Sequence, residues 1–252
     1  MGEAWHHFRS ALGDFSSDLP RMVGLNFLWC LTVLPFVYVV LIFAGAIVRS
    51  GSPTAVHPIN LITLVVLAIL ALALAGPSTA AVYQVTNDLA HGDLLELRRY
   101  WPAFRHHFRQ GWLLALLDAG AATLILLNIW FYWTFGRSGL WLLAIVFAYV
   151  GVLWFLVQSY LFALLVELKQ PLRLVVRNAL FLTIDSMGLT LGLAFVNLLV
   201  ILVNVLIPPL TFLWPISVAS LAHNQAIIAA IERYRKAGRL IRSQPPDSPD
   251  PS

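Results

Sequence analysis

Long stretches with almost no charged residue recur along this chain, and they constrain its fold more than any other feature. About 18 consecutive apolar residues are enough to cross a bilayer as a helix. The apolar fraction is 60% and the charged fraction 11%, whereas soluble domains have roughly 45–50% and about 25%. We therefore predict an all-α, polytopic membrane helix bundle of about six transmembrane helices, at residues 22–48, 60–83, 111–133, 140–166, 187–206 and 210–231.

The distribution of basic residues predicts the orientation of this bundle. With both termini in the cytoplasm, 14 of the 16 Lys and Arg residues lie in inner segments, as the positive-inside rule requires. Residues 1–21 then form a cytoplasmic N-terminal segment, 22–231 the membrane domain and 232–252 a basic tail that ends in a disordered, Pro- and Ser-rich stretch. The net charge of +4 therefore indicates topology and contact with anionic lipid rather than nucleic-acid binding.

Two polar inner segments have the pattern of amphipathic helices. In residues 87–110, aromatic and leucine side chains recur at spacings of three and four, arginines occupy much of the remaining surface, and Pro102 is expected to split the segment into two short helices. In residues 167–185, Pro171 suits a first helical turn, and basic residues follow at intervals of four. Both segments are candidates for docking to anionic lipid headgroups or to a cytoplasmic partner. The candidate docking residues are Arg98, Arg99, Trp101, Phe104, Arg105, Phe108, Arg109, Lys169, Arg173 and Arg177.

Asp118 is the most unusual residue, because it lies about two turns inside a predicted span. An unpaired carboxylate at that depth costs several kcal/mol, so we expect it to face the bundle and to have a partner. Asn26 and His223 are expected at a similar depth and are candidate partners. Asp118 is then a proton or cation site, a clamp between two helices, or a protonated carboxyl without a role.

Motifs of enzymes, metal sites and nucleotide-driven pumps are missing from the sequence. There is no HExxH, GxSxG, GxxxxGK[ST] or GxGxxG pattern, and the single cysteine, Cys30, can form neither an intramolecular disulfide nor a CxxC site. We therefore predict no catalytic residue, no cofactor and no metal site.

Several strings together resemble the YesL-like family of small bacterial membrane proteins, which carry a domain of unknown function. The strings are LNFLW at residues 25–29, GPSTAA at 76–81, the aromatic and basic pattern at 100–111 and RNAL at 177–180. The resemblance covers about residues 5–235. It implies a multi-pass protein of the bacterial cytoplasmic membrane that is associated with carbohydrate transport, with subunits of ABC-type sugar transporters as possible partners.

Gly76-Pro77 suggests a place for a polar cavity, because a proline frees backbone groups within a span. We place this candidate cavity at the inner end of the bundle. Two functions compete: a non-enzymatic accessory component of a transport system, and a small self-sufficient transporter or channel that uses Asp118 in an inner-leaflet cavity. The candidate cavity residues are Asn26, Gly76, Pro77, Ser78, Thr79, Asp118 and His223.

Overall fold

The computed structural model describes residues 19–49, 58–135, 139–213 and 215–236, and these residues form helices joined by turns. The expectations for the N-terminal segment and for the C-terminal tail therefore lie largely outside the described residues. The elements are α2 (Leu19–Arg49), α3 (Pro58–Ala90), η1 (Leu97–Arg99), α4 (Tyr100–His106), α5 (Phe108–Phe135), α6 (Leu142–Leu168), α7 (Leu172–Asp185), α8 (Met187–Leu206), η2 (Pro208–Phe212) and α9 (Pro215–Lys236).

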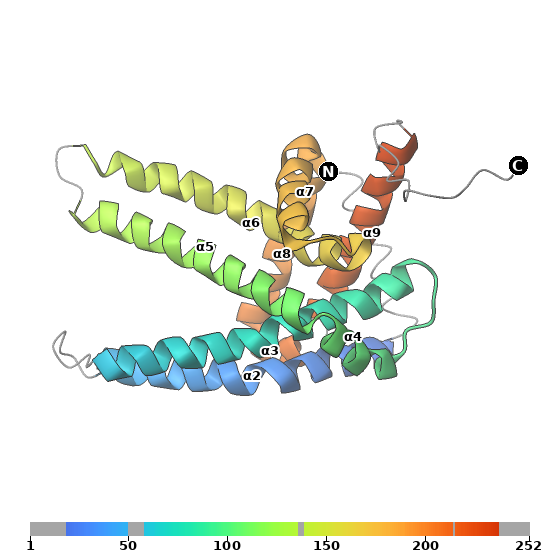
Figure 1. Ribbon diagram of the computed structural model, residues 1–252, viewed down its shortest axis with the longest axis horizontal. Helices are drawn as coiled ribbons and strands as arrows, with labels where there is room; N and C mark the ends of the chain where they lie inside the picture. Colours follow the sequence, from blue (N-terminus) through green and yellow to red (C-terminus); the bar gives the residue numbers. More distant parts are fainter. Residues whose placement is uncertain (1–18, 50–57, 136–138, 214, 237–252) are drawn as a thin grey trace, which may run out of the picture.

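Two long helical hairpins, α2–α3 and α5–α6, run side by side along the long axis of the molecule, while α7 and α8 lie across them (Figure 1). Within the described residues, four helical segments are long and apolar enough to cross a membrane: Ile62–Ala90, Phe108–Phe135, Leu142–Leu168 and Met187–Leu206. Their outward side chains are apolar and exposed, as in Trp133 and Tyr149 (72% and 73% exposed). The prediction of a helical membrane protein is confirmed, and the count of six spans with both ends inside stays a prediction.

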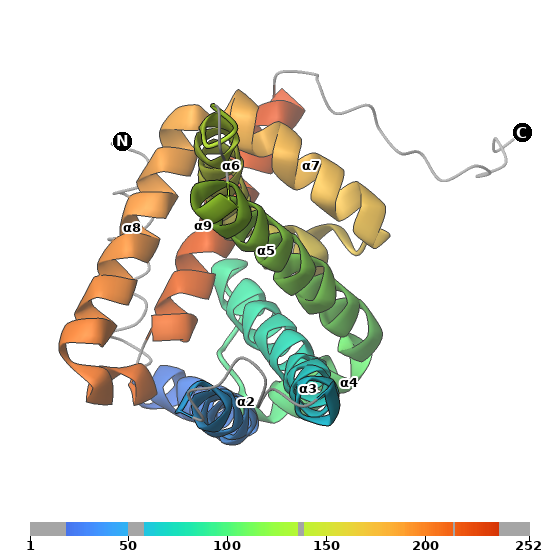
Figure 2. The same cartoon turned by 90° about the vertical axis from the view of Figure 1, so that its left-hand side faces the viewer.

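The last predicted span, 210–231, differs most from the observed elements. It is divided between the short turn η2 and α9, and α9 does not reach the apolar composition of the four segments above. The reason is that α9 lies in the middle of the bundle, surrounded by α2, α3, α6 and α8 (Figure 2). Small and polar side chains such as Ser217, Ser220 and Asn224 are buried there. A helix enclosed by protein does not need a lipid-facing apolar surface.

The buried core is concentrated at the end of the hairpins where α4 and α7 lie. One cluster joins the second half of α6 to α7 and α9, around Tyr160, Leu164 and Ile227. A second joins the first turns of α2 to the second half of α3, α4 and α9, around Leu25, Val82 and Tyr100. We call this end of the molecule the α4 end.

The segment between α3 and α5 contains two short helices, η1 and the seven-residue α4. Gly92 (φ +92°) ends the turn after α3, since this left-handed backbone conformation favours glycine. Pro102 is the third residue of α4, where a proline is tolerated because the first-turn N–H groups have no helical partner. The break in the helix comes instead at His107, so the predicted split at Pro102 was wrong.

The backbones of α3 and α5 touch at two glycines. A Cβ atom added to Gly76 would lie 2.2 Å from the carbonyl oxygen of Gly111, and one added to Gly111 would lie 2.9 Å from Cα of Pro77. No side chain fits between the helices at this point. Small residues of this kind allow membrane helices to pack closely.

We predict that Gly76→Ala destabilises the fold by about 1–3 kcal/mol, because a methyl group overpacks a backbone contact that cannot move aside. Unfolding in detergent micelles, followed by circular dichroism, measures this change. The matched control is Gly120→Ala on α5, where an added Cβ meets nothing within 4 Å. Equal stability of the two variants would contradict the packing argument.

Candidate functional site

Polar side chains gather where the second half of α3 meets α9. The hydroxyl of Thr86 accepts a hydrogen bond from Nδ2 of Asn224 (2.9 Å) and lies 3.0 Å from the hydroxyl of Ser220. Asn224 also donates to the backbone carbonyl of Tyr83 (2.9 Å), and the Tyr83 hydroxyl bonds to Nδ1 of His223 (2.7 Å). These residues form what we call the α3–α9 seam.

Tyr100 connects the α4 end to two further helices. Its hydroxyl is 2.6 Å from the Ser78 hydroxyl on α3 and 3.3 Å from the Thr32 hydroxyl on α2, and the side chain is fully buried. Directly after Ser78, the Thr79 hydroxyl accepts a hydrogen bond from the Trp29 indole on α2 (3.0 Å). α4 is therefore fixed in position by a buried side chain rather than lying loosely on the surface.

The residues of the predicted polar cavity do not converge on one space. Gly76 and Pro77 pack against Gly111, and Ser78 and Thr79 are engaged as described above. Asn26 accepts from the backbone N–H of Ile216 (3.1 Å) and donates to the carbonyl of Thr211 (2.7 Å), so it joins α2 to the start of α9. His223 belongs to the α3–α9 seam.

Asp118 has partners other than the two expected from the sequence. Its Oδ1 atom accepts two hydrogen bonds from α6. One comes from the Trp154 indole (2.9 Å) and the other from the Gln158 amide. Asn26 and His223 are bonded elsewhere. Of the roles considered for Asp118, this geometry favours the helix clamp, here between α5 and α6.

A hydrogen-bonded chain runs over the surface of the α4 end and engages two of the candidate docking arginines. Arg98 and Arg99 both donate to Glu96, at 2.9 and 3.1 Å, and Arg99 also donates to Asp88 (3.1 Å). Because these guanidinium groups neutralise carboxylates of their own segment, they offer less charge to a ligand. The hydrogen bonds to Arg98 and Arg99 hold the pKa of Glu96 below its usual range.

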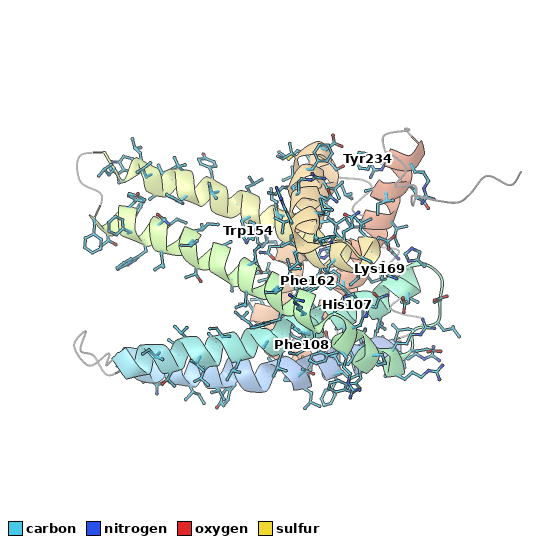
Figure 3. The ribbon with its side chains drawn as sticks, viewed as in Figure 1. His107, Phe108, Trp154, Phe162, Lys169 and Tyr234 are labelled. Atoms are coloured by element: carbon cyan, nitrogen blue, oxygen red, sulfur yellow. The ribbon has the colours of Figure 1, made fainter. Side chains whose placement is uncertain are left out.

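The same chain continues inward to His107. Gln84 donates to Asp88 (3.0 Å), and Oε1 of Gln84 lies 3.2 Å from Nε2 of His107. His107 is only 2% exposed, and burial together with the positive charges of His106 and Lys169 lowers its pKa to about 4. Figure 3 places His107 and Lys169 close together, where the junction of α4 and α5 meets the end of α6. The two predicted docking segments thus adjoin one another.

Five candidate docking residues keep their positive charge exposed: Arg105, Arg109, Lys169, Arg173 and Arg177. Within the described part of the chain, no carboxylate pairs with any of them. Trp101 and Phe108 are also exposed, at 49% and 40%, while Phe104 is partly buried against the α4 core. These residues are the part of the predicted docking set that remains available to a ligand.

Sequence reasoning missed a polar contact between α3 and the end of α6. Nδ2 of Asn87 donates to Glu167 (3.0 Å), whose other oxygen lies 3.7 Å from Nε2 of His91. Asn87 lies in the last turn of α3 and His91 directly follows this helix, so their spacing of four residues was visible in the sequence, but their partner on α6 was not. Buried atoms without a hydrogen-bond partner among the described residues include Asn87 Oδ1, His223 Nε2 and Asn224 Oδ1.

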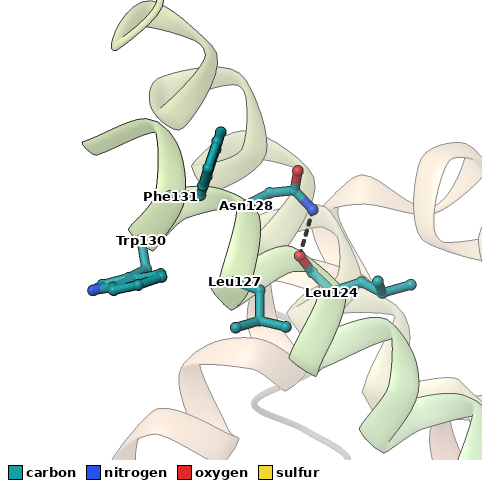
Figure 4. A pocket seen from close by; sticks show the side chains of 5 residues that line it. All are labelled: Leu124, Leu127, Asn128, Trp130 and Phe131. Carbon is teal, nitrogen blue, oxygen red and sulfur yellow. Dashed lines mark hydrogen bonds between the residues drawn. The ribbon is translucent and has the colours of Figure 1, made fainter. Parts of the chain in front are cut away.

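A hollow lies on the second half of α5, far along the helix from α4. It has a volume of about 330 Å³ and is lined by Leu124, Leu127, Asn128, Trp130 and Phe131 (Figure 4). The only polar side chain there, Asn128, donates to the carbonyl of Leu124 in its own helix (2.7 Å). Among the described residues, no group of three or more His, Cys, Asp or Glu side chains is placed to hold a metal ion.

Comparison with known proteins gives one match. Residues 54–129 match the family described as "Protein of unknown function, DUF624". This segment contains all of α3 and α4 and most of α5, and with them the Gly76–Gly111 contact. The match confirms the resemblance to a family of unknown function and is consistent with the YesL-like family. Searches of curated proteins and of solved structures give no match.

We predict that Asp118 and Gln158 are energetically coupled. Hydrogen bonds between membrane helices contribute about 0.6 kcal/mol on average and up to about 1.7 kcal/mol. A double-mutant cycle with Asp118→Ala and Gln158→Ala, measured by reversible unfolding in micelles, should give a coupling in this range. The pair Asp118→Ala and Asn26→Ala serves as the control and should be additive within about 0.5 kcal/mol. Coupling to Asn26 instead would contradict the observed pairing.

His107 should make stability depend on pH. Its pKa is about 4 in the folded protein against an ordinary 6.5, so between these values the unfolded chain binds a proton that the folded chain does not. The free energy of unfolding therefore falls as the pH drops through this window, by at most about 1.4 kcal/mol per pH unit, and is level above it. Unfolding curves at several pH values measure the slope. In His107→Gln this part of the slope should vanish; an unchanged slope would contradict the assignment.

Proposed function

We propose that this protein is a non-enzymatic accessory component of the bacterial cytoplasmic membrane that assists a carbohydrate transporter. It crosses the membrane six times, has both termini in the cytoplasm, uses no cofactor and presents its α4 end to the cytoplasm. The distribution of basic residues supports this orientation. The observation that carries the proposal is the outward surface of α7, on which basic and large apolar side chains are exposed together.

One side of α7 is buried against the protein core and the opposite side is exposed. Val175, Ala179 and Leu182 are buried against the core, so the apolar side predicted from the sequence packs on the protein itself. An interfacial helix that only anchors a protein would bury that side in lipid. The opposite side carries Arg173, Arg177, Phe181 and Ile184 at helical spacing, and the last two are 62% and 64% exposed.

This outward side of α7, which we call the α7 surface, defines the chemistry of its partner. At one end, two guanidinium groups without a carboxylate partner in the described part of the chain favour carboxylates. At the other end, two exposed apolar side chains favour an apolar contact. An amphipathic segment with acidic and apolar residues, such as a cytoplasmic loop helix of a membrane transporter subunit, fits both ends. The association with sugar uptake, and with ABC-type subunits in particular, rests on the family resemblance.

A transporter that works alone is the second candidate, and one observation favours it. Asn87, His223 and Asn224 each keep a polar atom buried and unpaired among the described residues, and polar groups at membrane depth are common along ion and proton pathways. Asp118 is not part of this group, because it is bonded to α6. Liposomes that contain only this protein distinguish the candidates: uptake of a sugar or an ion by them would favour the lone transporter.

We predict that a photoreactive residue at Phe181 crosslinks one dominant membrane protein in cells. The exposed side chain points away from the protein core, so it lies within reach of a partner at the α7 surface. Mass spectrometry of the adducts identifies the partner, which should be a transporter subunit. In the variant Arg173→Gln/Arg177→Gln, the yield of this adduct should fall about tenfold, since charge-assisted contacts are lost.

The control places the photoreactive residue at His107, which is 2% exposed on the same end of the molecule. There, adducts should form within the chain only. If the Phe181 probe gives lipid adducts alone, or if the adduct yield does not depend on Arg173 and Arg177, the docking function is contradicted.

A further inference from the structure

An open hollow of about 720 Å³ lies beside α4, and its described lining consists of Trp101, Pro102 and Arg105. The size is in the range of ligand sites, which run from about 300 to 1,000 Å³. The lining combines an amphipathic indole, a rigid ring and a guanidinium group. It therefore offers an apolar wall and a cation to the same ligand.

The positive charge of Arg105 at this hollow is not neutralised by any carboxylate in the described part of the chain. Arg98 and Arg99, a few residues earlier, are tied to Glu96 and Asp88, but among the described residues no carboxylate pairs with Arg105 or with Arg109. The two arginines are four residues apart in the sequence, on either side of the helix break at His107, and both are exposed. A guanidinium group binds phosphate oxygens through two parallel N–H donors, which makes phosphate a preferred ligand.

The hollow lies at the boundary of a membrane span. Phe108, the first residue of the apolar helix α5, is between Arg105 and Arg109 in the sequence. The rings of Trp101 and Phe104 meet edge to face at 5.7 Å, and those of Phe104 and Phe108 at 5.8 Å, so an aromatic row leads from the hollow to the start of the span. Tryptophan and arginine are the residues that proteins place at the level of lipid headgroups.

One side of the hollow is anchored to the protein core. Tyr100, next to Trp101, is fully buried and bonded to Ser78, and its ring contacts the Trp101 ring at 5.4 Å. A site whose residues are held in place before binding loses less entropy when the ligand arrives.

We propose that this hollow binds the headgroup phosphate of an anionic phospholipid from the inner leaflet. Arg105 holds the phosphate, Arg109 adds positive charge, and Trp101 covers the glycerol and upper acyl region. The position at the membrane boundary and the exposed aromatic row favour a lipid over a soluble phosphate compound, which would gain nothing from either. This site is separate from the α7 surface, and the proposal does not rest on the proposed function.

The test is native mass spectrometry of the full-length protein in detergent, with added phosphatidylglycerol or phosphatidylcholine of the same acyl chains. We expect retention of phosphatidylglycerol over phosphatidylcholine, and a fall of about tenfold in the bound fraction for Arg105→Gln, since a charge-assisted contact is lost. Arg173→Gln removes the same charge from the other basic segment and should leave the bound fraction unchanged. Thermal unfolding confirms that each variant is folded.

Three results would overturn the proposal. Equal losses for Arg105→Gln and Arg173→Gln would mean that positive charge anywhere on this end attracts the lipid. Equal retention of the two lipids would mean that the headgroup is not recognised. Displacement of phosphatidylglycerol by millimolar inorganic phosphate would assign the site to a soluble ligand. Should Arg105→Gln fail to fold, Arg105→Lys keeps the charge, loses the two-pronged contact and should give an intermediate retention.

Discussion

The backbones of α3 and α5 touch at Gly76 and Gly111, and much of the α4 end depends on this contact. Two residues beyond Gly76, Ser78 receives the hydroxyl of Tyr100, and one turn before Gly111 the carbonyl of His107 accepts the Gly111 N–H (2.7 Å). α4 lies between these two points, so the distance between α3 and α5 decides where it sits. The positions of the hollow beside Trp101 and of the basic residues around it therefore depend on the backbone contact between Gly76 and Gly111.

The buried polar groups of this molecule mostly pair with one another between helices. A polar group that leaves water without a partner costs free energy in a membrane as in a protein core, and most of those described here have one: Asp118 on α6, Tyr100 on α3, Asn26 at the start of α9. These contacts hold helices together. The chemistry open to other molecules lies instead on the surface of the α4 end, where arginines that no described carboxylate pairs with lie beside exposed aromatic rings.

The sequence predicted α5 and α6 nearly at their observed bounds, because both are continuous apolar helices with exposed outer surfaces. It also predicted the two sides of α7, since hydrophobic periodicity reports which side of a helix is buried. It did not predict that α9 is central, because hydropathy measures composition and not enclosure. The depth of Asp118 could be read from its place in a span, but the direction in which it points depends on how α5 packs, so its partners were misassigned. Arg99 looked free because one of its acceptors, Asp88, lies on the other side of the turn at Gly92.

The central place of α9 has a consequence for the order in which the chain assembles. α9 is the last helix among the described residues, yet it supplies the partners for residues of the first two described helices: Ile216 bonds to Asn26, 190 residues away, and Asn224 to Tyr83, 141 residues away. Contacts between such distant residues form late, because a long loop must close before they stabilise anything. The contacts of α9 with α2 and α3 are therefore expected among the last to form when the bundle assembles.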